Sequence, residues 1–205
     1  MNLFGFIICL AVNTWNFWKS LGKMAWEVLE GVRGAAIFHQ EKDGIPRRRS
    51  LHRDWSIPGQ VIKMPHQPQT LVSIGMNPST ADKDHDDPTV RKEYRWAKSY
   101  ACYQSYTKFN VCDAITSNPL NMLKMETPNS KGNHPFIISS LRKMDCDVLL
   151  SWGNLPRGLE YIAEDLLALL RKEGHILYCF KINQSGTPSH PRFINLPDLK
   201  MIRYP

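Results

Sequence analysis

Two polar side chains stand where an apolar run of the chain gives way to a turn. Asn77 follows the run TLVSIG within GMNPST, and His190 lies in PSHPRF, downstream of the run HILYCFK. A carboxamide can hold and orient a water molecule without carrying a charge, and a histidine can donate a hydrogen bond to a carbonyl oxygen or to a developing anion. Such residues could serve a site that holds a water molecule and stabilises a polar ligand. The structural alternative is that Asn77 caps a turn and His190 is an exposed loop residue.

The segment DKDHDDP, which follows Asn77, carries four aspartates. Oxygen ligands of this kind suit Mg²⁺, but the spacing matches no calcium-binding loop, and the HxxxH and CxxC zinc patterns are absent. We therefore expect no metal and no cofactor, with Asp82 and Asp84 in a solvated loop. Asp86 and Asp87, together with Arg91, are expected to order the wall of a site.

The sequence does not support a serine nucleophile. Ser79 or Ser151 paired with His190 would need the GxSxG turn of serine hydrolases, and the chain has none. Neither of the two common glycine-rich phosphate-binding loops occurs either. The sequence therefore argues against these standard hydrolase and nucleotide-binding classes.

The elements that must position these residues are short strands alternating with helices. The segment AAIFHQEKDGIPRRRSLHRDW predicts a hairpin that turns at Asp43-Gly44. Buried strands are predicted over residues 70–75, 106–112, 147–153 and 175–181.

Three helices are predicted between these strands. One begins with Asp87 as its N-cap and Pro88 in its first turn, and another spans Pro156 to Glu173 and ends at Gly174. The residues expected to face inward are Val90, Tyr94, Ala97 and Ala101 in the first helix, Ile137, Ile138, Leu141 and Met144 in the second, and Leu159, Ile162, Ala163, Leu166, Leu169 and Leu170 in the third.

This alternation predicts an α/β fold, a three-layer sandwich with a mainly parallel sheet of four to five strands. The carboxyl ends of parallel strands share one edge of the sheet, and ligands bind in the crevice outside that edge. Polar residues stand at or just after the end of every predicted strand. They lie in Asn77-Pro78-Ser79-Thr80 for the first strand, at Asn110 and Asp113 for the second, in Trp152-Gly153-Asn154 for the third, and in NQSGTPSHPRF, which holds Ser189 and His190, for the fourth. We therefore expect one site at that edge.

Composition is that of a globular protein, with 42% hydrophobic and 22% charged residues. The net charge is +7 and the sequence pI is about 9.2, a balance that favours polyanionic partners. The basic cluster in IPRRRSLHRDW adds to this preference for a phosphate backbone, although it is equally compatible with a solvated hairpin. Its members are Arg47, Arg48, Arg49 and Arg53.

We divide the chain into an N-terminal helical extension, residues 1–34, and a single α/β domain, residues 35–205. The apolar stretch Phe4 to Val12 is too short to span a bilayer and lacks the features of a signal peptide. It is an amphipathic helix, a membrane-surface segment or sequence ahead of a start at Met24. Five cysteines with no CxxC pair indicate a reducing compartment, and we expect a cytoplasmic protein.

The motifs NPSTADKDHDDPT, SWG and SHPRF, with an upstream LHRDW, resemble a bacterial and phage family known as domain of unknown function 1643. The resemblance covers about residues 35 to 196. It implies a role in phage or mobile-element DNA metabolism, but by itself it assigns no biochemical activity.

The same loops resemble, more distantly, the uracil-DNA glycosylase superfamily. GMNPS is similar to that superfamily's glycine-any-asparagine-proline-glycine motif, LLSWGN to its LLWG, and PSHPRF to its histidine-proline-serine loop. The resemblance implies that Asn77 positions the attacking water, that Asn110 reads the base edge, and that His190 stabilises the departing base. Ser79 stands where those enzymes usually have glycine, and Arg192 where they have serine.

The sequence thus predicts a nucleobase-recognising protein that acts on DNA, single-stranded or with a flipped base, and hydrolyses an N-glycosidic bond. Alternatives are a non-catalytic module that binds a modified base, a nucleotide or DNA, and a metal-dependent nuclease built on Asp82 to Asp87. Beyond Asn77, Asn110 and His190, the expected contacts are Met76 and Trp152 to the base, and Ser79, Thr80, Ser189, Arg192, Arg47, Arg48 and Arg49 to the nucleic-acid backbone.

Overall fold

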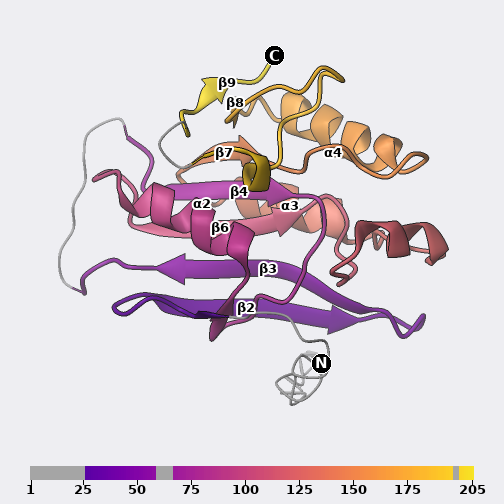
Figure 1. Ribbon diagram of the computed structural model, residues 1–205, viewed down its shortest axis with the longest axis horizontal. Coiled ribbons are helices and arrows are strands. Elements are labelled where there is room, and N and C mark those ends of the chain that lie inside the picture. The colour runs from indigo at the N-terminus through magenta and orange to yellow at the C-terminus, as the bar shows by residue number, and fades with distance from the viewer. Residues whose placement is uncertain (1–25, 59–66, 196–198) are drawn as a thin grey trace, which may run out of the picture.

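The computed structural model describes residues 26–58, 67–195 and 199–205. Its centre is one seven-stranded mixed sheet, and a separate two-stranded ribbon pairs β1 (Trp26–Glu27) with β5 (His85–Asp86). Figure 1 shows the sheet from β2 at the bottom to β9 at the top. The strands, in spatial order, are β2 (Arg33–Gln40), β3 (Pro46–Asp54), β6 (Ser105–Asn110), β4 (Thr70–Gly75), β7 (Cys146–Leu150), β8 (Leu177–Cys179) and β9 (Ile202–Arg203).

Four neighbouring strands, β6, β4, β7 and β8, are parallel. Their register places Val72 of β4 beside Thr107 on one side and beside Val148 on the other. The expected parallel core is therefore present, but the sheet is larger and more mixed than the four to five strands predicted. The hairpin β2–β3 joins it antiparallel through Leu51 and Lys108, and β9 adds antiparallel to β8.

The helices are α2 (Pro88–Lys98), α3 (Asn133–Leu141) and α4 (Glu160–Lys172), with two short 3₁₀ turns, η1 (Pro119–Lys124) and η2 (Pro191–Phe193). The predicted start of α2 is confirmed, because the Asp87 carboxylate accepts a hydrogen bond from the Val90 amide at 2.8 Å and Pro88 occupies the first turn. The predicted end of α4 is confirmed as well, since Gly174 adopts a φ of 78° just beyond it.

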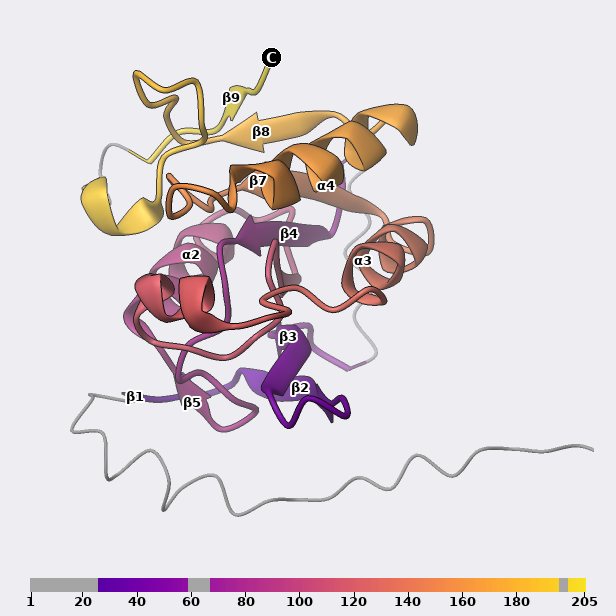
Figure 2. The ribbon, with the colours of Figure 1, turned by 90° about the vertical axis from the view of Figure 1, so that its right-hand side faces the viewer.

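Helices cover both faces of the sheet. The α2 helix packs on one face through Val90 and Tyr94, in a core with Leu71 and Tyr106 of the sheet. The α3 and α4 helices build a second core on the opposite face. Figure 2 shows α2 to the left of the sheet and α3 to the right. Because the helices change face on either side of β4, the winding of the chain reverses there, and a crevice forms at the strand ends.

Some predicted boundaries are wrong by a few residues. Ala101 is exposed and lies beyond the end of α2, and Met144 lies beyond α3. The α4 helix begins at Glu160 and not at Pro156, because Gly158 adopts a φ of 95°, which no right-handed helix contains. Leu169, expected to face inward, is 37% exposed.

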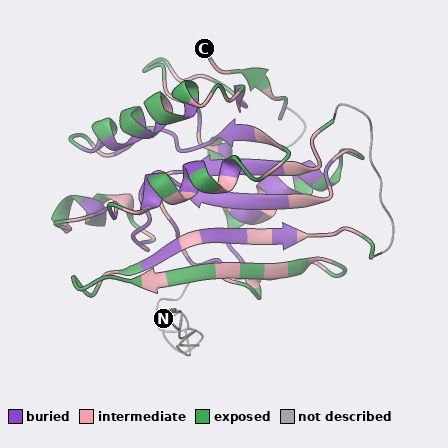
Figure 3. Ribbon diagram, turned by 180° about the vertical axis from the view of Figure 1, so that it is seen from behind, coloured by how far each residue is buried: buried purple, intermediate pink, exposed green. Residues whose placement is uncertain are grey.

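Burial is concentrated in the parallel strands, whereas the edge strand β2 alternates between exposed and partly buried residues (Figure 3). In the described part of the chain, no helix is both long and apolar enough to span a membrane. Most of the predicted N-terminal extension lies outside the described residues, as does Cys9. The remaining cysteines, Cys102, Cys112, Cys146 and Cys179, are free thiols.

The contrast between Leu166 and Leu169 on α4 tests this packing. Leu166 is fully buried, so Leu166→Ala should lower the free energy of unfolding by about 2–5 kcal/mol. Leu169→Ala, on the more exposed side of the same helix, should lower the free energy of unfolding clearly less. Urea unfolding followed by circular dichroism measures both, and equal losses would contradict the placement of α4.

Candidate functional site

Polar loops follow the four parallel strands and are joined to one another by backbone hydrogen bonds. The Cys112 amide donates to the Met76 carbonyl at 2.9 Å, which connects the loops after β6 and β4. The Gly153 amide donates to the Pro188 carbonyl at 2.9 Å, which connects the loops after β7 and β8. The loops are therefore joined in two pairs at the carboxyl ends of the parallel strands.

A pocket of about 480 Å³ opens at these strand ends beside η2. Five of the residues predicted for the site line it: Met76, Trp152, Ser189, His190 and Arg192. Asn77 and Asn110, which are also at the strand ends, are not among its lining residues. The structure thus brings the predicted histidine and base contacts together, and it places the two asparagines outside the pocket lining.

His190 is held in one orientation and one tautomer. It caps η2, with its Nδ1 accepting a hydrogen bond from the Arg192 amide at 3.2 Å. Burial, and next the positive charge of Lys108, lower the pKa of His190 below its ordinary value of 6.5. The ring is therefore neutral at pH 7 and its proton sits on Nε2. A neutral donor of this kind can stabilise an oxygen on which negative charge develops.

Gly153 makes room for this histidine. Its φ of 72° lies in the left-handed region, and a Cβ built on it would stand 3.0 Å from the Cβ of His190. This contact explains why the SWG motif has a glycine, because a larger residue would push the His190 loop away from the strand ends.

Asn77 uses its amide nitrogen within the protein. Its Nδ2 donates to the carbonyl oxygens of Pro78, at 2.9 Å, and Thr116, at 2.6 Å. These bonds fix the turn after β4 to the loop after β6, which is the structural role considered for this residue. The oxygen Oδ1 accepts no hydrogen bond from the described residues, so the side chain retains one acceptor.

Asn110, at the end of β6, is 1% exposed, and neither of its side-chain amide atoms has a hydrogen-bond partner among the described residues. A Cβ built on Gly75 would stand 3.1 Å from its Oδ1 and 2.9 Å from the Nζ of Lys108. The glycine of GMNPS thus opens the space in which both side chains lie. A buried amide without partners is costly, so its position requires an explanation beyond packing.

A buried ion pair that the sequence analysis missed lies beside this amide. The Lys108 ammonium of β6 is 2.7 Å from the Glu93 carboxylate of α2, and it donates to the hydroxyls of Ser73 and Ser151 at 2.9 Å each. The Tyr106 hydroxyl donates to the same carboxylate. Burial alone would raise the pKa of Glu93, but the Lys108 charge and these hydrogen bonds lower it below its ordinary value.

The sequence does carry a signal for this pair. Lys108 interrupts the apolar strand YTKFNVC, and Glu93 lies three residues after Val90, within the inward stripe of α2. Two opposite charges on buried faces of adjacent elements predict that they meet, because an unpaired buried charge is strongly unfavourable.

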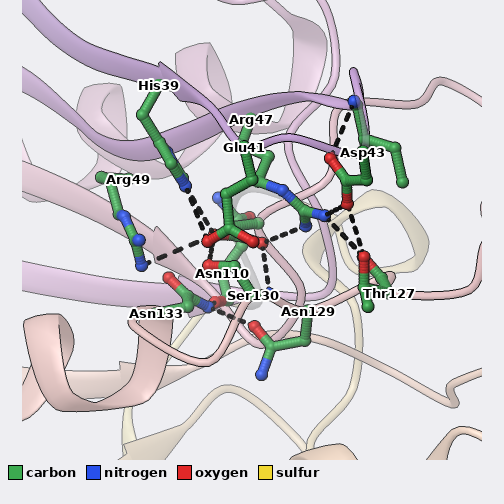
Figure 4. A network of polar contacts seen from close by, with 12 residues as sticks. His39, Glu41, Asp43, Arg47, Arg49, Asn110, Thr127, Asn129, Ser130 and Asn133 are labelled. Carbon is green, nitrogen blue, oxygen red and sulfur yellow. Dashed lines mark hydrogen bonds and ion pairs between the residues drawn. The ribbon is translucent and has the colours of Figure 1, made fainter.

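Two of the four arginines predicted to contact DNA are buried and bonded within the protein. Arg47, 0% exposed, pairs with the fully buried Asp113 at 2.9 Å and also bonds Thr127 (Figure 4). Arg48, 1% exposed, donates to the Ala81 carbonyl at 2.5 Å. Neither guanidinium is available to a phosphate backbone in this structure.

Arg49 differs from its neighbours because of a β-bulge. Ile37 pairs with Ser50 and Phe38 pairs with Arg48, so Arg49 is the extra residue of β3. Its guanidinium lies over the Phe136 ring of α3, 5.9 Å from the ring centre. It is also 3.6 Å from Asp113, in the cluster drawn in Figure 4. The bulge therefore turns Arg49 toward α3.

The acidic segment serves mainly to fix α2 and its preceding loop. Asp86 is fully buried, pairs with Arg53 at 2.8 Å and accepts from the Tyr94 hydroxyl at 2.6 Å. Asp87 caps α2, and Arg91 lies over the Trp26 ring at 5.6 Å. These residues support the elements around the site and do not line the pocket.

The remaining predicted residues occupy supporting positions. Thr80 is buried and Ser79 is partly buried in the turn after β4. The Ser189 hydroxyl donates to the Asn183 side chain. Within residues 26–58, 67–195 and 199–205, no group of three or more His, Cys, Asp or Glu side chains is arranged to hold a metal ion.

A family model described as "Protein of unknown function (DUF1643)" matches residues 48–192, so the chain belongs to this family. The match is somewhat shorter than the span expected from the motifs. No curated protein and no solved structure matches the chain significantly. The resemblance to uracil-DNA glycosylases therefore stays a hypothesis.

The tautomer and charge of His190 can be measured directly. Long-range ¹H–¹⁵N spectra of the histidine rings should show the His190 proton on Nε2, because Nδ1 accepts from Arg192. A pH titration of the same signals should give a pKa below 6.5, in line with its burial. A proton on Nδ1, or a pKa above that value, would contradict the geometry.

The buried ion pair predicts an asymmetric mutational response. Lys108→Met leaves the Glu93 carboxylate buried and unpaired, and should lower the free energy of unfolding by about 3–5 kcal/mol. Lys98→Met, at the exposed end of α2, should change it by about 0.5 kcal/mol or less. Adding Glu93→Gln to Lys108→Met should recover part of the loss. Equal effects of the two lysine variants in urea unfolding would refute the pairing.

Proposed function

We propose that this member of the DUF1643 family recognises a nucleobase of DNA in the pocket beside η2 and hydrolyses its N-glycosidic bond. The observation that carries the proposal is His190, a neutral histidine that lines a pocket and has Nε2–H as its available donor. Cleavage of this bond leaves electrons on the base, and a donor at a base oxygen stabilises the charge that develops there.

The surroundings of the pocket support a planar ligand. Met76 and Trp152 line it, and Phe193 lies on its rim, so apolar and aromatic groups are available to the faces of a base. The parallel strands with helices on both faces are compatible with the proposed glycosylase-like α/β sandwich. A base reaches such a pocket only after it leaves the stack, so the substrate is single-stranded DNA or a flipped nucleotide.

The two asparagines have separate roles in this proposal. Asn77 retains a free acceptor, Oδ1, that can orient a water molecule for attack. Asn110 offers an unpartnered donor and acceptor on one planar amide, which complements a base edge. Because Asn110 is 1% exposed and lies outside the pocket lining, this contact requires the strand ends to open when the base binds.

The proposal is tested by incubating the protein with single-stranded and duplex oligonucleotides that carry uracil or a modified base. Released base is quantified by chromatography and mass spectrometry. His190→Gln should slow release by roughly 10²–10³-fold, as the loss of one such donor does. His175→Gln is the matched control, since His175 lies ahead of β8 at the opposite edge of the sheet.

Release should also depend on pH in a defined direction. Protonation places a hydrogen on Nδ1, where the Arg192 amide already donates, and so disturbs the orientation of His190. Release should therefore fall as the pH falls through the pKa of His190, below 6.5. If no base is released across the panel while DNA binding persists, the hydrolytic proposal is wrong.

A second candidate function is recognition of a base without chemistry. The observation that favours it is that the Asn77 amide nitrogen donates to two backbone carbonyls. These bonds give Asn77 a structural role, whereas the hydrolytic proposal needs it to position the attacking water. A salt-dependent affinity for DNA that survives Asn77→Ala, without base release by the unmodified protein, would support this candidate.

A further inference from the structure

The rim of the pocket carries two cations that no described carboxylate neutralises. Lys181 and Arg192 line the pocket, and its lining contains no acidic residue. Both side chains are exposed, and neither forms an ion pair with a described residue. Lys181 lies on the loop after β8, and Arg192 lies in η2, so the pocket opening is positively charged from two separate segments.

An exposed aromatic ring stands on the same rim. Phe193 is 82% exposed, the highest value among the large hydrophobic side chains of the described residues, and the next highest is Leu120 at 60%. Its ring centre is 6.1 Å from that of His190, with the rings at 62°. Phe193 therefore adds nothing to either core, and its face is free to receive a planar group.

The rim is built on fixed backbone. The Lys92 ammonium of α2 donates to the carbonyl oxygens of Pro191, at 2.8 Å, and of Ile194, and so holds both ends of η2 against the helix. Across the pocket, the Asn154 carboxamide accepts from Asn183 at 3.2 Å. Both walls thus have internal bonds that restrain the segments from which the rim side chains project.

Lysine, arginine and an exposed aromatic ring around one opening are the combination that binds single-stranded nucleic acid. A ring can stack only on a base whose face is uncovered, and the bases of a duplex are already stacked. The burial of Arg47, Arg48 and Arg53 also removes the broad basic cluster that a duplex footprint would use. What remains is a narrow basic opening.

We infer that Lys181, Arg192 and Phe193 form a rim that selects single-stranded over duplex DNA. The two cations contact consecutive phosphates, and Phe193 stacks on the base adjacent to the one in the pocket. This inference rests on the proposed function for the identity of the pocket ligand. It adds that the substrate is single-stranded, and it adds Lys181 and Phe193 as binding residues.

The test is fluorescence anisotropy with a labelled single strand of about 12 nucleotides and its matched duplex, over about 50 to 200 mM salt. The unmodified protein should bind the single strand more tightly. Lys181→Met and Arg192→Met should each reduce the slope of log affinity against log salt by about 0.7, because each removes one phosphate contact. Phe193→Ala should weaken binding by roughly 5- to 100-fold at every salt concentration.

The controls are Lys172→Met, an exposed lysine at the end of α4, and Ile176→Ala, a 53% exposed apolar residue at the opposite edge of the sheet. Neither should change the slope or the affinity. Equal affinity for single strand and duplex, or rim variants that bind like these controls, would overturn the inference.

Base release separates this result from the proposed function. If the protein releases base from saturating single-stranded DNA but the rim variants bind normally, the rim is refuted and the hydrolytic function stands. If the rim variants lose binding as expected but no base is released, the rim is supported and the hydrolytic proposal fails.

Discussion

The arrangement of the strand ends depends on the buried pair of Lys108 and Glu93. The ammonium joins β6 to the hydroxyl of Ser73 on β4 and to that of Ser151, the residue after β7, and the carboxylate brings α2 to the same point. One interaction therefore connects a helix with three parallel strands, directly below the loops of the candidate site. Because an unpaired charge at this depth is so unfavourable, the pair also limits how far these elements can shift relative to one another.

The same pair influences the chemistry of the surface above it. The positive charge of Lys108 contributes to the lowered pKa of His190, while Gly75 leaves space for Lys108 and for the unpartnered amide of Asn110. A positive charge near a histidine disfavours its protonation, so Lys108 helps to keep His190 a neutral donor.

The hairpin β2–β3 shows how sequence and position can diverge. Its turn at Asp43-Gly44 was correctly predicted. Its basic cluster, however, was predicted to be exposed to solvent or to a phosphate backbone. Docking of β3 beside β6 brings Arg47 to the buried Asp113 and Arg53 to the buried Asp86. These pairings join residues far apart in the chain, so local patterns contain little information about them.

The sequence by itself determined the order and type of the central elements and the edge at which polar residues gather. Hydrophobic periodicity, the cap at Asp87 and the glycine at the end of α4 are local signals, and the parallel strands that they imply share one edge. Only the tertiary structure decided which polar residues line the pocket, which arginines are buried, and that seven strands form the sheet. Those outcomes depend on long-range pairing and on where each side chain is desolvated, and neither follows from spacing along the chain.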